Sequence, residues 1–248
     1  MSNDSLRAPI RYAEVLTTGQ TIALDKAQLL ALKFREINVK EAFTLADCHG
    51  QFFRAALTAA ESGGGKAQIY EAMATSPESS LDLTLFCAVL ARQRMLGVIQ
   101  KATELGVMAV VPVFSEKSVP ASGLAHEKAH AWPAQALRAA RQCRRASIPR
   151  VASAITLAAA LETPHFQAAN LRYYLDDRAP VGAGLSDQRK PASRIAFVVG
   201  PEGGFTNGER THLAACGATP LRLGGRVLRA ETAALVGVAL LQHHFGDL

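Results

Sequence analysis

Cysteine is scarce in this 248-residue chain, and its spacing excludes the folds that cysteine usually holds together. The four cysteines, Cys48, Cys87, Cys143 and Cys216, are widely scattered and form no Cys-x-x-Cys pair. Neither a zinc site nor a disulfide framework is therefore expected, and we predict no metal. The reduced cytoplasm is the expected location.

Long apolar runs are also missing, and we expect no secretory leader. No stretch reaches the roughly 18–20 uninterrupted apolar residues that cross a bilayer. The first seven residues lack the basic-then-apolar order of a secretory signal. With 49% hydrophobic and 19% charged residues, the composition is that of a folded protein. We expect no membrane partner.

Acidic residues are absent from a long basic segment in the middle of the chain. The formal net charge is +6, yet residues 1–72 hold eight basic and eight acidic side chains. Residues 128–161 contain no acid and six basic residues. Arg138, Arg141 and Arg145 are spaced so that one face of a helix would carry all three. Such a face favours nucleic-acid phosphates as partners, and a solvated helix flank is the alternative.

The start of the chain predicts a small β domain. Apolar segments at 42–46 and 51–58 flank a turn-like sequence, as in a β-hairpin. The polar, proline-containing stretch 76–80 is typical of a domain boundary. The expected domains are therefore residues 1–74 and residues 75–248.

After this boundary, apolar strands alternate with amphipathic helices. Continuous apolar runs at 83–90 and 107–114 are typical of strands buried on both faces. Between them, apolar residues repeat at helical spacing. Further strands are expected at 171–176, 195–200 and 221–223, and helices at 127–145, 156–162, 207–216 and 231–244. Strands separated by helices predict an α/β fold with a mostly parallel, covered sheet.

Two of the predicted strands end in glycine-rich turns. The first is Val-Val-Gly-Pro-Glu-Gly-Gly-Phe at 198–205, and Thr206 with Glu209 can form a capping box behind it. The second is Leu-Arg-Leu-Gly-Gly-Arg-Val-Leu-Arg at 221–229. Such turns offer backbone donors at the strand ends where open α/β sheets bind ligands. A plain strand-to-helix turn is the alternative, but it does not explain the carboxylate of Glu202 inside the first turn.

These turns resemble the signature loops of a known family. Gly-Pro-Glu-Gly-Gly-Phe at 200–205 and Leu-Gly-Gly-Arg-Val-Leu-Arg-Ala-Glu-Thr-Ala at 223–233 are similar to the two loops of the 16S ribosomal RNA uridine-N3 methyltransferases. That family, ribosomal RNA small subunit methyltransferase E, belongs to the SPOUT superfamily of knotted methyltransferases. Segments 100–112 and 139–145 agree in the same order, so the resemblance covers most of 83–245.

The resemblance implies a fold, a cofactor and partners. It implies an α/β SPOUT methyltransferase domain with a deep trefoil knot that binds S-adenosylmethionine and forms a homodimer. The first 74 residues are similar to a small PUA-like β-barrel, which we expect to be an RNA-binding domain. The implied reaction methylates N3 of one uridine in 16S ribosomal RNA of the small ribosomal subunit. Because residues 1–72 carry no net charge, we expect this domain to contribute less to RNA binding than in the relatives.

The chemistry assigns roles to single residues. Attack by uridine N3 requires removal of its proton and stabilisation of the negative charge that develops. We expect Glu202 to accept the proton and Arg229 to stabilise the anion, with Glu231 as the alternative base. The residues expected to bind RNA are Lys117, Arg138, Arg141, Arg145 and Arg229. The residues expected to bind S-adenosylmethionine are Leu175, Gly200, Glu202, Gly203, Gly204, Leu223, Gly224, Val227, Leu228 and Thr232.

Two other functions remain open at this point. The chain could be a SPOUT methyltransferase for a transfer RNA or for another ribosomal RNA base. It could also be a non-catalytic RNA-binding assembly protein that keeps the fold. Departures from the family pattern bear on the target: Lys117 stands where the family tends to carry Arg, and Arg141 where it tends to carry Glu.

Overall fold

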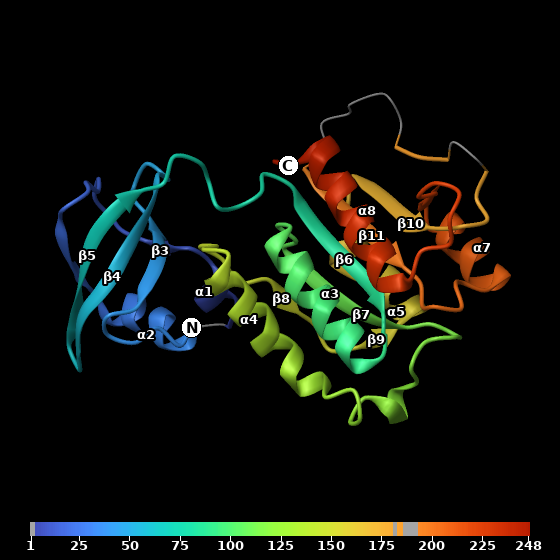
Figure 1. Cartoon of the computed structure of the whole chain (residues 1–248), viewed down its shortest axis with the longest axis horizontal. Helices are drawn as coiled ribbons and strands as arrows, with labels where there is room; N and C mark the ends of the chain where they lie inside the picture. Colours follow the sequence, from blue (N-terminus) through green and yellow to red (C-terminus); the bar gives the residue numbers. More distant parts are fainter. Residues whose placement is uncertain (1–2, 181–182, 186–192) are drawn as a thin grey trace. The chain divides into compact units, whose positions relative to one another are not determined.

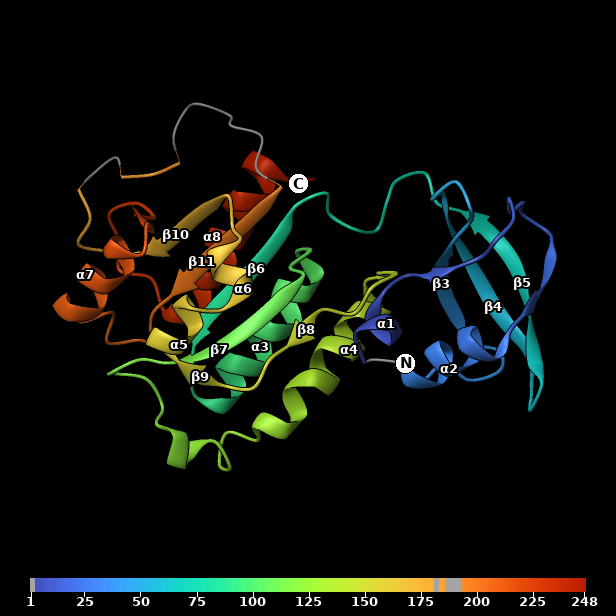
Figure 2. The same cartoon turned by 180° about the vertical axis from the view of Figure 1, so that it is seen from behind.

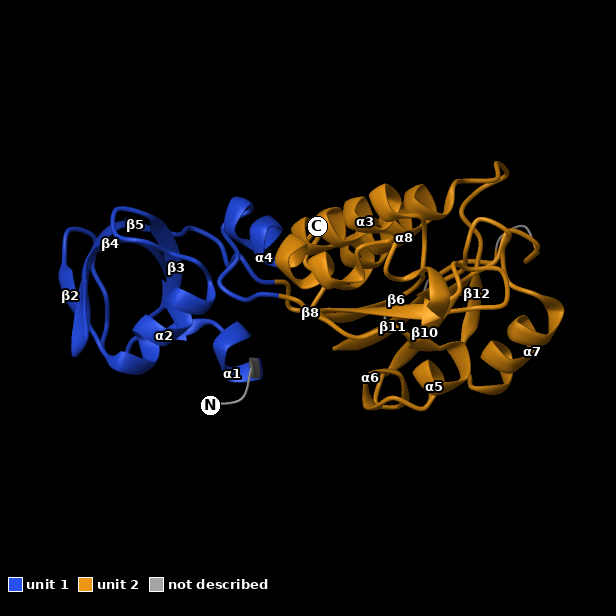
Figure 3. Ribbon diagram, turned by 90° about the horizontal axis from the view of Figure 1, so that it is seen from below, with its two compact units in different colours: residues 1–78, 137–148 blue, residues 79–136, 149–248 orange. Residues whose placement is uncertain are grey.

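The computed structural model describes residues 3–180, 183–185 and 193–248. Two compact units make up the chain (Figure 3). Each unit has its own sheet and its own buried core.

The units are not consecutive stretches of sequence. Unit 1 contains residues 1–78 and 137–148, and unit 2 contains residues 79–136 and 149–248. The boundary expected after residue 74 lies near the first crossing between the units. No local pattern in the sequence indicates that a later segment returns to unit 1, because that return depends on contacts between distant residues.

Unit 1 is built on a five-stranded sheet of order β1-β3-β4-β5-β2, in which only β1 and β3 run parallel. The predicted hairpin is confirmed as β3 and β4, with Phe43 opposite Ala55. Ala55, Ala67 and Ile69 are fully buried in its core. Its elements are α1 (Asn3–Arg7), β1 (Ile10–Arg11), β2 (Thr21–Leu24), α2 (Lys26–Phe34), β3 (Ala42–Ala46), β4 (Phe52–Glu61) and β5 (Gly64–Ala72) (Figure 1).

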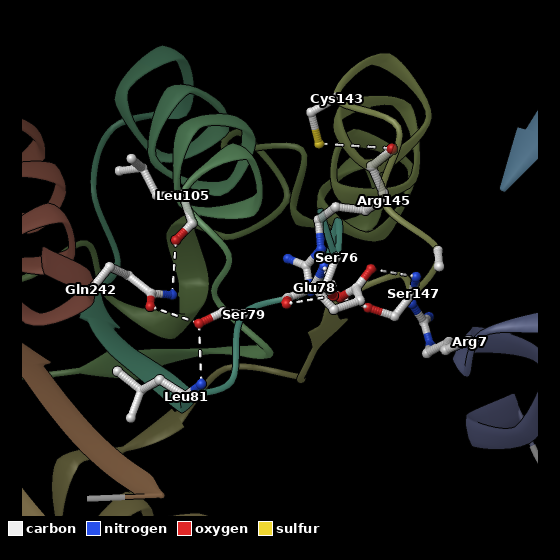
Figure 4. Close-up of polar contacts among 12 residues, drawn as sticks. Arg7, Ser76, Glu78, Ser79, Leu81, Leu105, Cys143, Arg145, Ser147 and Gln242 are labelled. Carbon is white, nitrogen blue, oxygen red and sulfur yellow. Dashed lines mark hydrogen bonds and ion pairs between the residues drawn. The ribbon is translucent and has the colours of Figure 1, made fainter. Parts of the chain in front are cut away.

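The returning segment is held to unit 1 by a buried polar network. Arg145 Nη2 donates to Glu78 Oε2 at 2.8 Å, and the Ser147 amide donates to Glu78 Oε1 at 2.8 Å (Figure 4). Arg35, 6% exposed, donates from Nη2 to the carbonyl of Ala146 at 3.2 Å. Burial lowers the pKa of Arg35 to about 10, although the nearby Glu78 charge acts in the opposite direction. These buried contacts explain why residues 137–148 fold with unit 1.

This segment also changes the charge of unit 1. Residues 1–78 and 137–148 together carry twelve basic and nine acidic side chains. The expectation of a neutral N-terminal domain is therefore wrong, because the arginines of 137–148 belong to this unit.

Unit 2 is an α/β layer structure whose sheet has the order β12-β10-β11-β6-β7-β8, with β9 also paired to β7. Every pairing in this sheet is parallel, which confirms the predicted parallel sheet. Its strands are β6 (Asp82–Ala88), β7 (Ala109–Phe114), β8 (Arg150–Val151), β9 (Ile155–Thr156), β10 (Leu171–Leu175), β11 (Arg194–Val199) and β12 (Thr219–Leu221). Its helices are α3 (Arg92–Glu104), η1 (Ala121–Gly123), η2 (Ala129–Ala131), α5 (Leu157–Leu161), α6 (Pro164–Gln167), α7 (Asn207–Ala215) and α8 (Ala230–Phe245).

Helices cover both faces of this sheet. Leu85 and Phe197 point into one core with residues of α3 and α8. Their neighbours Phe86 and Val198 point into a second core with residues of α5, α6 and α7. Figure 2 shows α5 and α6 in front of the sheet strands, on the face seen from behind. Burial of alternate residues on opposite faces explains why these strands are continuous apolar runs in the sequence.

The basic helix is shorter than the sequence predicts. Helix α4 (Trp132–Gln142) replaces the expected helix at 127–145. Lys128 at φ 50° and Arg144 at φ 65° have left-handed backbone conformations, which a right-handed helix cannot contain. Arg145 therefore does not extend the helical face of Arg138 and Arg141.

Candidate active site

The two glycine turns meet at the carboxyl edge of the unit 2 sheet and line one pocket. The first turn follows β11 and the second follows β12, and both strands pair with β10. The pocket has a volume of about 200 Å³. It is lined by residues 175–178, 199–205, 210, 221–228, 230 and 233.

The residues predicted for cofactor binding line this pocket, with one exception. Leu175 comes from the end of β10, and the others come from the two turns. Thr232 is not among the lining residues. It lies in the first turn of α8, where Ala230 and Ala233 face the pocket instead.

The turns form an open cradle because glycine occupies their tightest points. Gly204 has φ +62° and Gly224 has φ +69°, the left-handed region that favours glycine. A Cβ built at either position has no neighbouring atom within 4 Å, so both glycines border open space. The first turn is closed by a hydrogen bond of 2.9 Å from the Gly204 amide to the Pro201 carbonyl.

Behind the first turn, a loop after β7 fixes its position. The predicted capping box is confirmed, with Thr206 and Glu209 bonding to each other's backbone at the start of α7. Glu209 Oε1 also accepts from the amide of Glu116 at 2.8 Å. Lys117 Nζ donates to the Gly203 carbonyl at 3.0 Å. Lys117, predicted to bind RNA, is thus tied to the glycine turn in this structure.

A charged cluster stands at the edge of the pocket. Arg94 in the first turn of α3 forms an ion pair with Glu202 through its Nη1. The Nε atom of Arg94 lies 3.8 Å from Glu231 Oε1 in the first turn of α8. The two carboxylates that the sequence offers as alternative bases therefore share one arginine, which sequence reasoning missed.

A second ionic contact supports the opposite wall. Asp176, which follows β10, lies 3.9 Å from Arg210 of α7, and both side chains are largely buried. Arg178 donates its amide to Asp176 Oδ1 at 3.0 Å. Burial raises the pKa of Tyr174, which is raised further by the charge of Asp176 and lowered by that of Arg210. Asp176 is the last residue of the predicted strand 171–176, and this strand end is the one signal by which Asp176 and Arg178 could have been found.

Arg229 is exposed at the N-cap of α8 and is not among the lining residues. Within the described ranges its guanidinium has no hydrogen bond or ion pair to another side chain. Its position immediately before Ala230 places it next to the pocket wall along the chain.

Comparisons with known proteins identify the family. The RNA methyltransferase domain model matches residues 77–242. The ribosomal RNA small subunit methyltransferase E of Synechocystis is 31% identical over 223 residues, covering 88% of this chain and 72% of that protein. The chain belongs to the ribosomal RNA small subunit methyltransferase E family. The Mycobacterium bovis member is 30% identical and is covered over 90% of its length.

Solved structures agree with this membership in the methyltransferase E family. The crystal structure of the Neisseria gonorrhoeae family member bound to S-adenosyl methionine has a TM-score of 0.69 and 32% identity. It covers 97% of this chain, and this chain covers 99% of it. A putative methyltransferase from Legionella pneumophila in complex with the same cofactor has a TM-score of 0.63 and 28% identity over 96% of this chain.

The pocket of this methyltransferase E chain fits S-adenosylmethionine by its own chemistry. Gly204 and Gly224 leave space in which a ligand can approach the backbone. Val227, with 83% of its surface exposed, and Leu228 offer apolar walls in the second turn. Exposed apolar side chains beside a polar pocket are typical of a surface that a ligand covers.

The arginines of residues 137–148 that were expected to bind RNA differ in burial and in ion pairing. The Arg145 side chain is 3% exposed and pairs with Glu78 within unit 1, so its predicted phosphate contact is wrong. Arg141 lies 3.1 Å from Glu41 and is partly exposed. Arg138 is exposed. The sequence concealed these differences because the acids that neutralise Arg141 and Arg145 precede them by many residues.

The described residues contain neither a metal-binding group nor a membrane-spanning helix. Their acidic, cysteine and histidine side chains form no group able to hold a metal ion. Their helices include none with the length and apolar character needed to span a membrane.

Proposed function

We propose that this protein transfers a methyl group from S-adenosylmethionine to N3 of a uridine in 16S ribosomal RNA of the small ribosomal subunit. The observation that carries the proposal is the pocket built by two glycine turns in a chain of the methyltransferase E family. Glycine backbone at Gly204 and Gly224 would hold the cofactor, with Leu223, Val227 and Leu228 against its flat parts. The bound cofactor supplies an electrophilic methyl group.

Glu202 and Arg229 would act on the uracil ring. The carboxylate of Glu202 would accept the proton from N3, and the freed electron pair of N3 would bond to the methyl carbon as its bond to the sulfonium sulfur breaks, so that the cofactor would leave as the neutral thioether S-adenosylhomocysteine. The negative charge that develops spreads over N3 and the flanking carbonyl oxygens, where Arg229 can stabilise it. Glu202 lines the pocket and Arg229 adjoins its wall along the chain, which supports both roles.

Family membership also supports the finer architecture. We propose that unit 2 contains the trefoil knot and that unit 1 is PUA-like and binds RNA. A homodimer is supported by exposed apolar residues on α8, Val236 at 44% and Leu240 at 36%. They are four residues apart and so lie on one face of the helix. With ribosomal RNA as substrate, the protein acts in the cytoplasm.

Separate basic groups would contact the RNA. In unit 1 these are Arg138 and Arg141, and in unit 2 they are Lys117 and Arg229. Arg145 is excluded because its guanidinium is buried against Glu78.

The test is methylation of small subunits purified from a strain that lacks this protein. Mass mapping of 16S RNA before and after incubation should reveal one new methyl group on a uridine base. Methylation of free transfer RNA alone would overturn the ribosomal target. Absence of both transfer and cofactor binding would indicate a non-catalytic assembly protein.

The cofactor site is tested with a matched pair of glycine variants. Gly204→Val and Gly50→Val both place a side chain at positive φ, +62° and +81°, in space free of protein atoms. The backbone strain is about 1–2 kcal/mol in each. Only Gly204→Val should weaken S-adenosylmethionine binding in calorimetry, by at least about tenfold or roughly 1.4 kcal/mol. Unchanged affinity in a folded Gly204→Val protein would overturn the assignment.

A further inference from the structure

Helix α3 begins in a way that its own sequence does not favour. Its N-cap, Ala91, makes no side-chain hydrogen bond, and its first turn contains no acidic residue. Arg92 and Arg94 stand there instead. The N-terminus of a helix carries partial positive charge, so a cation in the first turn is unfavourable. Residues outside the helix must therefore account for an arginine at this position.

Two carboxylates from distant parts of the chain meet Arg94. Glu202 pairs with its Nη1 and Glu231 lies near its Nε, so different edges of one guanidinium face the two acids. The side chains of Arg94 and Glu202 are 40% and 41% exposed, and that of Glu231 is 23% exposed. The Oε2 atom of Glu231 is buried without a hydrogen-bond partner among the described residues. Glu231 thus holds Arg94 from the interior side, and Glu202 meets it at the pocket edge.

The surroundings of Glu202 explain why such a contact is needed. Pro201, Gly203 and Gly204 flank it, and none has a long side chain that could restrict its carboxylate. A half-exposed glutamate samples several rotamers, and a base must be held in one geometry to act efficiently. An arginine presents a planar fork whose edges can bind two carboxylates at once, which a lysine amine cannot reproduce.

We propose that Arg94 is the positioning residue of the active site. This role rests on the proposed function. Arg94 holds the carboxylate of Glu202 where it accepts the N3 proton, and Glu231 anchors Arg94. Arg94 acts through Glu202 and takes no proton itself. The Arg94–Glu202 ion pair contributes little to folding, because solvent screens an exposed pair and the two side chains lose rotamer freedom when they form it. Its role is therefore separable from stability.

The experiment compares steady-state methylation of small subunits by four variants: Arg94→Ala, Arg94→Lys, Glu202→Gln and the double variant Arg94→Ala/Glu202→Gln. Arg94→Ala should lower kcat about 10- to 100-fold, the range expected when a reacting group is misplaced. The KM for RNA and the cofactor Kd should stay within about twofold. Arg94→Lys should recover part of the loss. When Glu202→Gln is already present, adding Arg94→Ala should lower kcat further by less than about twofold.

The matched control is Arg194→Ala. Arg194 pairs with Asp82 at 3.0 Å with similar exposures of 47% and 42%, at the opposite, amino-terminal ends of β11 and β6. It should leave kcat unchanged. An unaltered kcat in Arg94→Ala overturns the proposal, as does an equal loss in both backgrounds. A kcat loss that merely accompanies lowered melting temperature and weaker cofactor binding also overturns it. An inactive wild-type protein would instead defeat the proposed function itself.

Discussion

A glycine in helix α8 fixes how closely that helix approaches the sheet beneath the pocket. An ideal Cβ at Gly237 would lie 2.2 Å from Cζ and 2.7 Å from Cε1 of Phe197. Phe197 belongs to β11 and is fully buried, so its ring cannot swing into solvent. Ordinary carbon contacts lie at about 3.5–4.0 Å, so Gly237→Ala would require a shift of at least about 1.3 Å.

Two opposing effects decide the stability of Gly237→Ala. Alanine is favoured over glycine inside a helix by about 1 kcal/mol. Overfilling a packed core costs about 1–3 kcal/mol, and a contact this short lies at the upper end. We therefore expect a net loss of about 2 kcal/mol. For a unit of this size, that lowers the melting temperature by roughly 4–8 °C. Because Ala230 and Ala233 of α8 line the pocket, displacement of the helix should also weaken cofactor binding.

The assay is thermal and urea unfolding followed by circular dichroism, with Gly97→Ala as the matched control. Gly97 also lies within a helix, α3, but a Cβ there meets nothing within 4 Å. Gly97→Ala should therefore stabilise the protein by up to about 1 kcal/mol. Adding Phe197→Leu to Gly237→Ala should cost less than the two single changes together, since the smaller side chain relieves the clash. A Gly237→Ala protein as stable as Gly97→Ala would refute this reasoning.

Two further predictions concern unit 1. Burial alone would raise the pKa of Glu78, but the charge of Arg145 and the hydrogen bonds from Arg145 and Ser147 outweigh it and hold the pKa below its ordinary value. The stability from this carboxylate is thus fully present above its unfolded-state pKa and is lost as the pH falls through the lower folded-state pKa. Glu78→Gln should cost about 3–5 kcal/mol near pH 7, because it removes the carboxylate charge that faces the buried Arg145 guanidinium, and urea unfolding should show a smaller cost near pH 3. A cost independent of pH would contradict this account. Replacing Arg138 and Arg141 with Ala should flatten the log–log salt dependence of RNA binding by about two units, without changing cofactor affinity. An unaltered slope would end their assignment to RNA.

The order of elements in unit 2 is readable from the sequence because each signal is local. Buried parallel strands need continuous apolar runs, and the capping box at Thr206 and Glu209 lies within four residues. Gly204 and Gly224 indicate turns in the sequence because the positive φ at each position favours glycine, whatever the fold places around it. The predicted strand positions agree with β6, β7, β10 and β11 to within two residues at each end. They agree because a strand that is buried on both faces must be a continuous apolar run.

The partners and the burial of the charged side chains depend on tertiary structure. Arg138, Arg141 and Arg145 form one pattern in the sequence, yet Arg145 is buried against an acid 67 residues earlier. Glu202, one of the two acids beside Arg94, lies 108 residues away along the chain. An ion pair depends on distance in space, and spacing along the chain carries no information about a partner on another strand or helix.

The sequence by itself therefore determined the parallel α/β unit, its two ligand-facing turns and the family to which the chain belongs. Only the tertiary structure decided that residues 137–148 fold with the N-terminal unit and that one arginine serves both candidate bases. The physical reason is the range of the interactions. Backbone angles and apolar periodicity act within a few residues, whereas buried charges are satisfied by whichever groups the fold brings beside them.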